Sequence, residues 1–418
     1  MPHAAPGNVT RRRRGFSSRA LLLLSIVALV AAACRGSEGE GDGDDVITFG
    51  SALSLTGDTA TEGQLVRDGY DFMVKHINDA GGIEVGDQTY TIEIKYYDDQ
   101  SDADTSVRLY ERLIVEDEVD FLLGPYGDVT LPVSAVSERH QIPMVVAHAA
   151  TTSIYEQGFK YLFATLATVE NYTGPMLEMA TTLDPPVETV ALVNENALFP
   201  QAGIDAAAEQ AEELGIEVVY NENFPTGTRD LTPLISSVKN LDPDMMIVGH
   251  RSTAEIITFV KQSVDQDLDV PLRGYLLGPT LPGFVEDLGD EAEGALEPIQ
   301  WDPTLEWEDQ FFGWSAQEWA DLFEEEFGYT PDYHPPQSAA ALEVYMDALQ
   351  RAGTLDRQAV RDAIAETDIM TFYGPVKFNQ NGQNDAKGMP VVQIQSGAPE
   401  IVWPEEVATA DLLYSPPS

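Results

Sequence analysis

The sequence predicts an α/β protein of two lobes, each a mostly parallel β-sheet flanked by helices. Short apolar segments alternate regularly with segments whose apolar residues recur at helical spacing. This alternation runs once over residues 46–164 and starts again at residue 187. In the last third, long helices precede several strands, so the chain can return to complete one lobe and then the other.

The stretch 119–153 shows this pattern most clearly. The apolar run 121–123 is stopped by Gly124-Pro125, residues 129–139 have helical spacing, and a second apolar run covers 142–146. A strand–helix–strand unit of this length is a right-handed crossover between parallel strands. Both of its loops emerge at the carboxyl edge of the sheet, where open α/β folds bind small ligands. Taken alone, the loop residues fit ordinary turns equally well.

The other elements follow from the same two periodicities. Further strands are predicted at 46–55, 89–97, 159–164, 187–193, 216–220, 244–248, 272–277 and 295–300. Helices are predicted from about residue 62 to Gly81-Gly82, and at 102–116, 129–139, 201–214, 231–240, 253–264, 282–288, 315–327, 335–352 and 355–366. The C-terminal strands are predicted at 372–378, 389–394 and 401–403.

Composition excludes some partners. The 418 residues are 43% hydrophobic, enough for domains with real cores. With 70 acidic and 23 basic residues, the formal net charge is −47. Such a surface repels phosphates, so no nucleic acid partner is expected. The scarcity of lysine favours a halophilic-type acidic surface over a merely soluble one.

That interpretation gives a first prediction. We expect the Tm to rise with NaCl concentration, because counterions screen the repulsion among surface carboxylates. A thermal denaturation series in NaCl checks this, and a Tm that does not rise with salt would contradict salt adaptation.

The N-terminus reads as an export signal. Residues 1–33 are predicted to be a signal peptide, in which Arg11 to Arg14 precede the apolar run 20–33. Val30-Ala31-Ala32-Ala33-Cys34 resembles a bacterial lipobox, which implies lipidation at Cys34; the alternative is an ordinary residue after a cleavage site. Arg13-Arg14 also resembles part of a twin-arginine signal. Residues 34–45 form an acidic, glycine-rich tether. The protein is therefore expected in the periplasm or at the cell surface, touching the membrane only through its lipid anchor.

The sequence gives little support for catalysis. It has no nucleophile elbow and no His-Glu-x-x-His motif, and Cys34 is its only cysteine. We therefore expect no enzyme, no cofactor and no metal. An exported hydrolase stays open as an alternative, since the paired carboxylates of a glycosidase leave no fixed spacing in a sequence.

Several short motifs occur in a familiar order: Thr56-Gly57, Asp79-Ala80-Gly81-Gly82-Ile83, Gly124-Pro125-Tyr126, Ala149-Ala150-Thr151, Gly278-Pro279 and Phe372-Tyr373-Gly374-Pro375. Together they resemble the branched-chain amino-acid type (Leu/Ile/Val-binding-like) of ABC-transporter substrate-binding protein, in the type I periplasmic-binding-protein family. The resemblance implies two lobes joined by three hinge crossings and closing on a ligand. Lobe 1 would comprise 46–168 and 298–374, and lobe 2 would comprise 169–297 and 375–418. The ligand would be an amino acid or a related small polar solute, passed to ABC permease subunits. A ligand-binding sensor subunit is a further alternative.

The resemblance also implies which positions bind the ligand. These are Thr56, Glu62, Tyr126, Gly127, Asp128, Thr130, Ala149, Ala150, Thr151, Phe199, Arg251, Ser252 and Thr280. Ordinary structural roles are open for some of them: Thr151 can cap a helix, and Arg251 can pair with nearby acids. Residues 329–336 form a proline-braced loop that can also lie near the cleft.

Three positions depart from the family pattern. Thr280 stands where the amino-acid binders have an acidic residue for the ligand ammonium, and Glu62 stands where they have an aromatic wall. Asp128 stands where they have serine, unless a one-residue gap gives that role to Thr130. A desolvated carboxylate beside a ligand carboxylate is unfavourable. Either Asp128 points away, or the ligand is not an ordinary α-amino acid.

Overall fold

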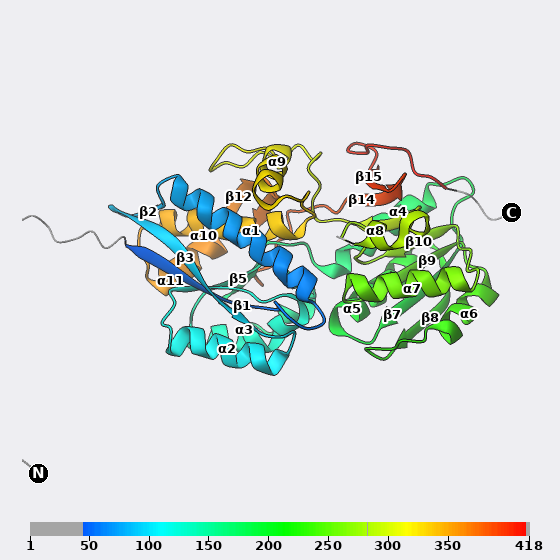
Figure 1. Ribbon diagram of the computed structural model, residues 1–418, viewed down its shortest axis with the longest axis horizontal. Helices are drawn as coiled ribbons and strands as arrows, with labels where there is room; N and C mark the ends of the chain where they lie inside the picture. Colours follow the sequence, from blue (N-terminus) through cyan, green and yellow to red (C-terminus); the bar gives the residue numbers. More distant parts are fainter. Residues whose placement is uncertain (1–44, 282, 415–418) are drawn as a thin grey trace, which may run out of the picture. The chain divides into compact units, whose positions relative to one another are not determined.

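The computed structural model describes residues 45–281 and 283–414, which contain two large sheets (Figure 1). The signal peptide 1–33, Cys34 and almost all of the tether lie outside the described residues. Over the described residues, none of the helices combines the length and the apolar character that a bilayer crossing requires.

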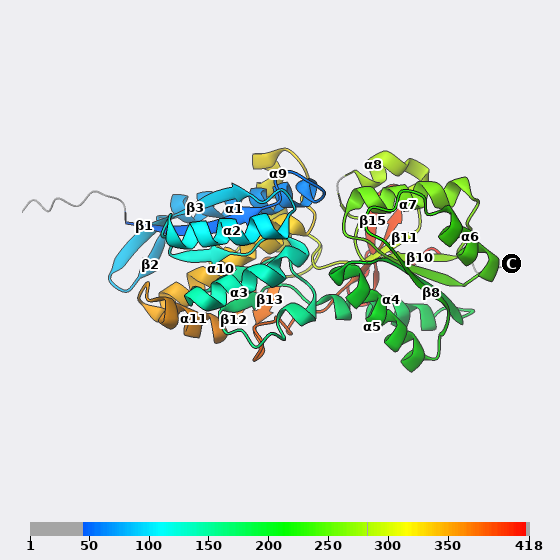
Figure 2. The ribbon, with the colours of Figure 1, turned by 90° about the horizontal axis from the view of Figure 1, so that it is seen from below.

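The first sheet has six strands in the order β2-β3-β1-β4-β5-β6. Their bounds are β1 Val46–Leu53, β2 Ile83–Val85, β3 Gln88–Asp98, β4 Phe121–Leu123, β5 Met144–Val146 and β6 Leu162–Ala164. All pairs are parallel except β2 with β3. Figures 1 and 2 show the sheet between two helical layers, α1 (Ala60–Asp79) with α10 (His334–Ala352), and α2 (Ala103–Val115) with α3 (Thr130–His140).

The second sheet has seven strands in the order β15-β14-β11-β10-β9-β7-β8. Their bounds are β7 Thr189–Glu195, β8 Glu217–Phe224, β9 Met245–Gly249, β10 Leu272–Tyr275, β11 Ala295–Pro298, β14 Val391–Gln395 and β15 Ala398–Trp403. Strands β7 to β11 are parallel, and β14 is added antiparallel to β11. Helices α4 (Thr173–Thr181) and α5 (Leu198–Leu214) cover one face, and α6 (Thr232–Leu241), α7 (Thr253–Asp265) and α8 (Phe284–Leu288) the other (Figure 2).

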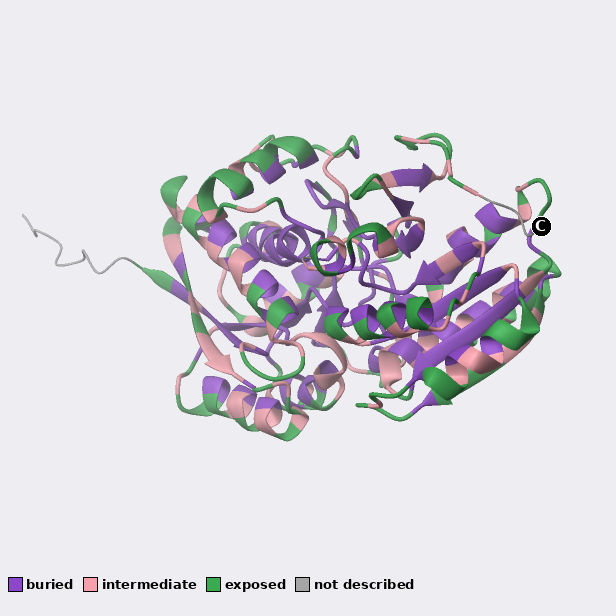
Figure 3. Cartoon of the chain, turned by 45° about the vertical axis from the view of Figure 1, so that its right-hand side comes forward, coloured by how far each residue is buried: buried purple, intermediate pink, exposed green. Residues whose placement is uncertain are grey.

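The last third returns to the first sheet before it ends on the second. Helices α9 (Ala316–Phe327), α10 and α11 (Arg357–Ala365) pack on the core of the first lobe. Helix α10 is buried over nearly its whole length (Figure 3), which fits its run of alanines and apolar side chains. The fully buried ring of Trp319, on α9, stacks on Phe323 and Phe372 at 5.2 and 5.0 Å, so these aromatic side chains form part of the core of the first lobe.

The elements differ from the predictions in three places. The strand predicted at 372–378 is a hairpin of β12 (Asp368–Thr371) and β13 (Gly374–Lys377), because Gly374 turns the chain at φ +117°. Since β13 pairs with β12 on the first lobe, residues 375–378 lie there and not in the second lobe, and we propose a boundary after Phe378. Strand β2 and helix α4 were not predicted.

Three crossings connect the sheets, after β6, after β11 and after β13. The side chain of Gln300, on the second crossing, accepts from the Ala167 N–H at 3.2 Å and donates to its carbonyl oxygen at 3.0 Å. The Tyr373 hydroxyl, beside the third crossing, donates to Gln300 Oε1 at 2.9 Å. Asn384 on the third crossing donates to the carbonyl oxygen of Thr165 at 2.8 Å. The crossings are therefore hydrogen-bonded to one another.

Candidate solute-binding cleft

A cavity of about 100 Å³ lies where the loops after the strands of both sheets meet. The first lobe lines it with Thr59, Ser101, Tyr126, Gly127, Asp128, Val129, His148 and Ala150, and the second lobe with Phe199, Arg251 and Leu277. The start of α10 adds Tyr333, His334 and Gln337, and the first crossing and the segment after it add Leu166 and Tyr172. The carboxyl ends of parallel strands converge there because every βα crossover leaves its loop at that edge.

The structure brings part of the predicted set together at this cavity. The predicted positions among the lining residues are Tyr126, Gly127, Asp128, Ala150, Phe199 and Arg251. They come from the loop after β4, the loop after β5, the start of α5 and the loop after β9, so the loops highlighted by the sequence are the ones that converge.

Other predicted positions lie outside the lining. The exposed Thr56 donates its hydroxyl to Asp98 at 2.8 Å, and the buried Thr130 donates its hydroxyl to the carbonyl oxygen of Pro125 at 3.4 Å. The Ala149 carbonyl oxygen accepts from the Tyr155 hydroxyl at 2.6 Å, and Ser252 is the N-cap residue of α7. These contacts stabilise the loops on which the lining residues lie.

Two buried threonine hydroxyls are left over. Neither Thr151 Oγ1 nor Thr280 Oγ1 has a hydrogen-bond partner of good geometry within the part of the chain that the structure describes. The two hydroxyls lie near the carboxyl groups of Asp128 and Glu297, respectively, and oppose the rise in the pKa of each. The Thr280 backbone N–H, in contrast, donates to Glu297 Oε2 at 2.7 Å. A buried hydroxyl without a partner costs free energy, so both groups are open to a polar ligand or to water.

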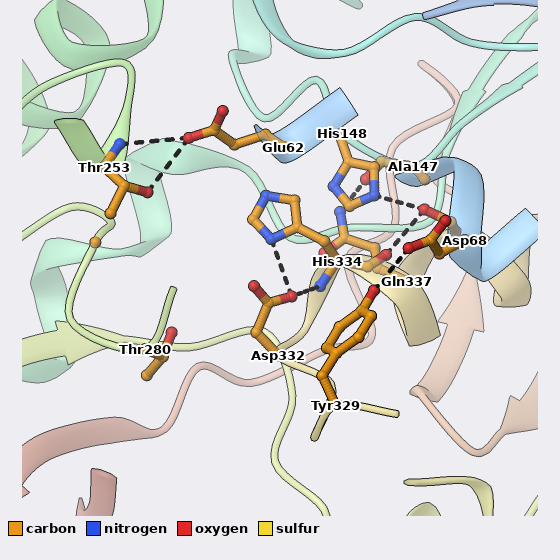
Figure 4. A network of polar contacts seen from close by, with 12 residues as sticks. Glu62, Asp68, Ala147, His148, Thr253, Thr280, Tyr329, Asp332, His334 and Gln337 are labelled. Carbon is orange, nitrogen blue, oxygen red and sulfur yellow. Dashed lines mark hydrogen bonds and ion pairs between the residues drawn. The ribbon is translucent and has the colours of Figure 1, made fainter. Parts of the chain in front are cut away.

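Two carboxylates of the first lobe reach helix starts of the second. Glu62 Oε1 accepts from both the N–H and the hydroxyl of Thr253 at 3.3 Å, at the start of α7 (Figure 4). Asp128 Oδ2 accepts from the Phe199 N–H at 3.2 Å, at the start of α5. Among the described residues, neither helix has a side-chain cap from its own N-cap residue. The carboxylates therefore supply the missing caps across the cleft, where the helix dipole favours negative charge.

Burial alters the acid chemistry of this contact. Loss of water raises the pKa of Asp128, and the Phe199 N–H and the positive charge of Arg251 oppose that rise. The Asp128 carboxylate is thus satisfied by a helix N-terminus, although the residue lines the cavity.

The start of α10 supplies a wall that was foreseen only as a nearby loop. The rings of His148 and His334 stack at 4.9 Å, and His334 also stacks on Tyr333 at 4.3 Å. His148 Nε2 is hydrogen-bonded to Ser338 Oγ at 2.8 Å, and His334 Nδ1 lies 3.2 Å from Asp332 Oδ1 (Figure 4). Burial, and secondarily His334, lowers the pKa of His148 well below its usual range. This wall was missed because α10 follows β5 by nearly 190 residues; the prolines in 329–336 were its only signal.

The cavity lies in acidic surroundings. Burial raises the pKa of Glu297 to about 7, against the N–H groups of Thr280 and Gly278, which donate to it. Burial also raises the pKa of Tyr126 well above its usual range, and Glu62, Asp332 and Asp128 add to that rise. In the described structure, Asp332 Oδ2 is buried without a hydrogen-bond partner.

Arg251 is the only lysine or arginine among the described residues that line the cavity. Its guanidinium is already paired, donating from Nε and Nη2 to the Glu195 carboxylate at 3.0 and 3.2 Å. A polar solute would therefore enter a site with more negative than positive groups around it.

Two α/β lobes, three crossings and a cavity between the carboxyl ends of both sheets define a two-lobed solute-binding protein. The sequence model of the family described as Periplasmic binding protein matches residues 46–399, and the chain belongs to this family. Membership confirms the prediction of a solute-binding protein that is not an enzyme.

Relatives and solved structures are similar over most of their length. The leucine-, isoleucine-, valine-, threonine- and alanine-binding protein of Pseudomonas aeruginosa is 25% identical over 346 residues, which cover 81% of this chain and 87% of that protein. The isoleucine complex of a branched-chain amino acid transporter substrate-binding protein from Streptococcus pneumoniae superposes with a TM-score of 0.75 at 19% identity, covering 85% of this chain and 98% of that one. The benzoate complex of a solute-binding protein from R. palustris gives a TM-score of 0.72 at 17% identity, with 88% and 98% covered. These likenesses confirm the predicted two-lobed fold.

Proposed function

We propose that the protein is the extracytoplasmic receptor of an ABC importer, that it binds an amino acid or a related small solute carrying an ammonium group, and that it delivers this solute to the membrane permease. The observation that supports this proposal most directly is the excess of carboxyl groups around the cavity. Asp128 lines the cavity, and the charges of Glu62, Glu297 and Asp332 act on the lining tyrosines Tyr126 and Tyr333. The lining holds a single arginine, Arg251. An ammonium ion stabilises ionised carboxylates that burial alone disfavours.

The unpartnered groups suit such a solute. Asp332 Oδ2 can accept from an ammonium N–H, and the hydroxyls of Thr151 and Thr280 can bond to its polar groups. Arg251 can share its guanidinium between Glu195 and a ligand carboxylate, since it carries five donors. The aromatic side chains of Tyr126, Phe199 and the Tyr333 wall would enclose the apolar part.

The same aromatic wall favours a second candidate, a small aromatic carboxylate. The R. palustris protein was solved with benzoate, and another from Rhodopseudomonas palustris BisB5 with 3,4-dihydroxy benzoic acid. A flat ring would stack on the cavity wall, and Arg251 would bind the carboxylate.

A binding screen tests the proposal. The Tm of the protein is measured with and without each of leucine, isoleucine, alanine, threonine, benzoate and 4-hydroxybenzoate. The affinity of the folded protein for each ligand is measured by calorimetric titration. Saturable stabilisation by amino acids without consumption in NMR supports the proposal. Stabilisation by benzoate and 4-hydroxybenzoate alone would show that the ligand is an aromatic carboxylate and not a solute with an ammonium group. Consumption of the ligand would contradict the proposal that the protein is a transport receptor.

One substitution addresses the ammonium contact. Asp332→Asn should weaken amino-acid binding by about tenfold, because a hydrogen bond to a charged group contributes roughly 1.5 kcal/mol or more. Calorimetry on this variant is compared with Asp79→Asn, which changes an exposed aspartate at the end of α1. Equal affinity of Asp332→Asn and the wild type would remove Asp332 from the site.

A further inference from the structure

A second group of polar side chains lies at the carboxyl edge of the second sheet. Glu195 ends β7, His250 follows β9, and Glu255 lies in the first turn of α7. One ligand atom from each of the three lies within 4.8 Å of the others. None of the three is among the residues that line the solute cavity, although Arg251 borders both places.

His250 is the unusual member of this group. It is 1% exposed, and neither of its ring nitrogens has a hydrogen-bond partner among the residues described. Phe224 and Phe259 hold its ring at centroid distances of 5.1 and 5.9 Å. A buried imidazole without any partner is costly, and native structures normally give such groups one. Its packing fixes the ring beside two carboxylates, so a bound cation is the partner that this arrangement lacks.

The two carboxylates have capacity for a cation in addition to Arg251. Glu195, fully buried, accepts from Arg251 with both oxygens, but each oxygen keeps a second lone pair. Glu255 Oε2 is buried and has no hydrogen-bond partner of good geometry within the described residues, although the Glu255 carboxyl group lies beside Ser252 and the Glu195 carboxyl group. Its other oxygen lies 3.9 Å from Arg251 Nη2. One guanidinium, that of Arg251, therefore faces two adjacent carboxyl groups, and the imidazole of His250 beside them has no partner among the described residues.

We propose that Glu195, His250 and Glu255 form a binding site for a divalent first-row transition metal such as Zn²⁺. One imidazole with two carboxylates suits such metals, whereas Mg²⁺ and Ca²⁺ prefer sites made of oxygen ligands alone. Three protein ligands leave the fourth position of a tetrahedral zinc ion open to water. The site goes beyond the proposed transport function, and it revises the expectation from the sequence that the protein binds no metal.

The test must separate this site from weak binding by the acidic surface. The untagged protein is treated with EDTA, dialysed, and titrated with ZnCl₂ by calorimetry in high NaCl and excess Mg²⁺, which occupy surface carboxylates. A parallel titration with Co²⁺ reports an imidazole ligand through its visible absorption. We expect one Zn²⁺ per chain under these conditions.

Two variants test the proposed ligands, and a third is the control. His250→Gln and Glu255→Gln should each weaken Zn²⁺ binding by at least about tenfold, since even partners outside the coordination sphere cost that much in metal sites. The control is His140→Gln, because His140 also pairs with a glutamate, Glu111, at 2.9 Å but lies on α3. Circular dichroism checks that each variant is folded, and Glu255→Gln alone decides the matter if the His250 variant does not fold.

The outcomes are exclusive. One equivalent of Zn²⁺ that is lost in the His250 and Glu255 variants and kept in the His140 variant supports the site. Absence of binding by the wild type, or affinities that are the same in all four proteins, would overturn it.

Discussion

Replacing Glu62 and Asp128 together by alanine is expected to weaken solute binding by roughly 100-fold while each lobe stays folded. Each carboxylate accepts hydrogen bonds from a helix start across the cleft, buried at Glu62 and partly buried at Asp128. Hydrogen bonds to charged groups contribute about 1.5–3 kcal/mol each, and two lost contacts of about 1.5 kcal/mol multiply to this factor. Because these contacts exist only when the lobes meet, their loss shifts the population toward open forms and lowers the apparent affinity.

The single variant Glu62→Ala separates the effect of closing the cleft from the effect of direct contact with the solute. Glu62→Ala should weaken binding by about tenfold, although Glu62 lies outside the cavity lining. Calorimetry gives the affinity, and small-angle scattering with and without solute gives the degree of closure. Asp79→Ala, at the exposed end of the same helix, is the control. An affinity unchanged in Glu62→Ala would show that this contact does not stabilise the closed form.

Glu343→Gln is expected to stabilise the protein increasingly as the pH rises. Glu343 lies in α10, fully buried, and neither carboxyl oxygen has a hydrogen-bond partner among the described residues. Burial raises its pKa well above the usual range, and the negative charge of Asp309 adds to the rise. The two Asp309 carboxylate oxygens already accept from the N–H groups of Phe311 and Phe312 at 2.7 and 2.6 Å. We therefore ascribe the effect of Asp309 on the pKa of Glu343 to its negative charge and not to a hydrogen bond.

The sign follows from proton linkage. The folded state keeps the Glu343 proton at a pH where the unfolded chain has released it, so full stability is present only below the unfolded pKa. Between the unfolded and folded pKa values, the wild type loses about 1.4 kcal/mol of unfolding free energy per pH unit. The glutamine variant should match the wild type near pH 4 and exceed it progressively above that. Glu297, whose pKa is also raised, contributes equally to both proteins and cancels in the difference.

Urea denaturation between pH 4 and 8 measures this difference. Glu84→Gln, on the exposed side of β2, is the control and should show no pH-dependent gain. A constant difference between Glu343→Gln and the wild type over the whole range would mean that Glu343 is not held protonated by the fold.

The sequence was sufficient where local periodicity governs structure. The two runs of strand and helix gave the lobes, and the loops after β4 and β5 gave Tyr126 and Ala150 at the cavity. It could not show that α10 brings His334 against His148, because that pairing depends on tertiary packing between distant segments. Nor could it show that the acidic groups of Glu62 and Asp128 contact helix starts, since a single sequence carries no sign of which N–H groups a carboxylate will meet.

The hydrogen bonds among the three crossings have a mechanical consequence. If the three crossings were not connected to one another, the two lobes could bend, twist and slide relative to each other, and each crossing would resist these motions separately. Gln300 connects the second crossing to the first and, through Tyr373, to the start of the third. Displacing one crossing relative to another therefore breaks hydrogen bonds. Motions of the lobes that keep these hydrogen bonds are therefore less costly than motions that break them, so we expect the cleft to open by a rotation in which the three crossings bend together.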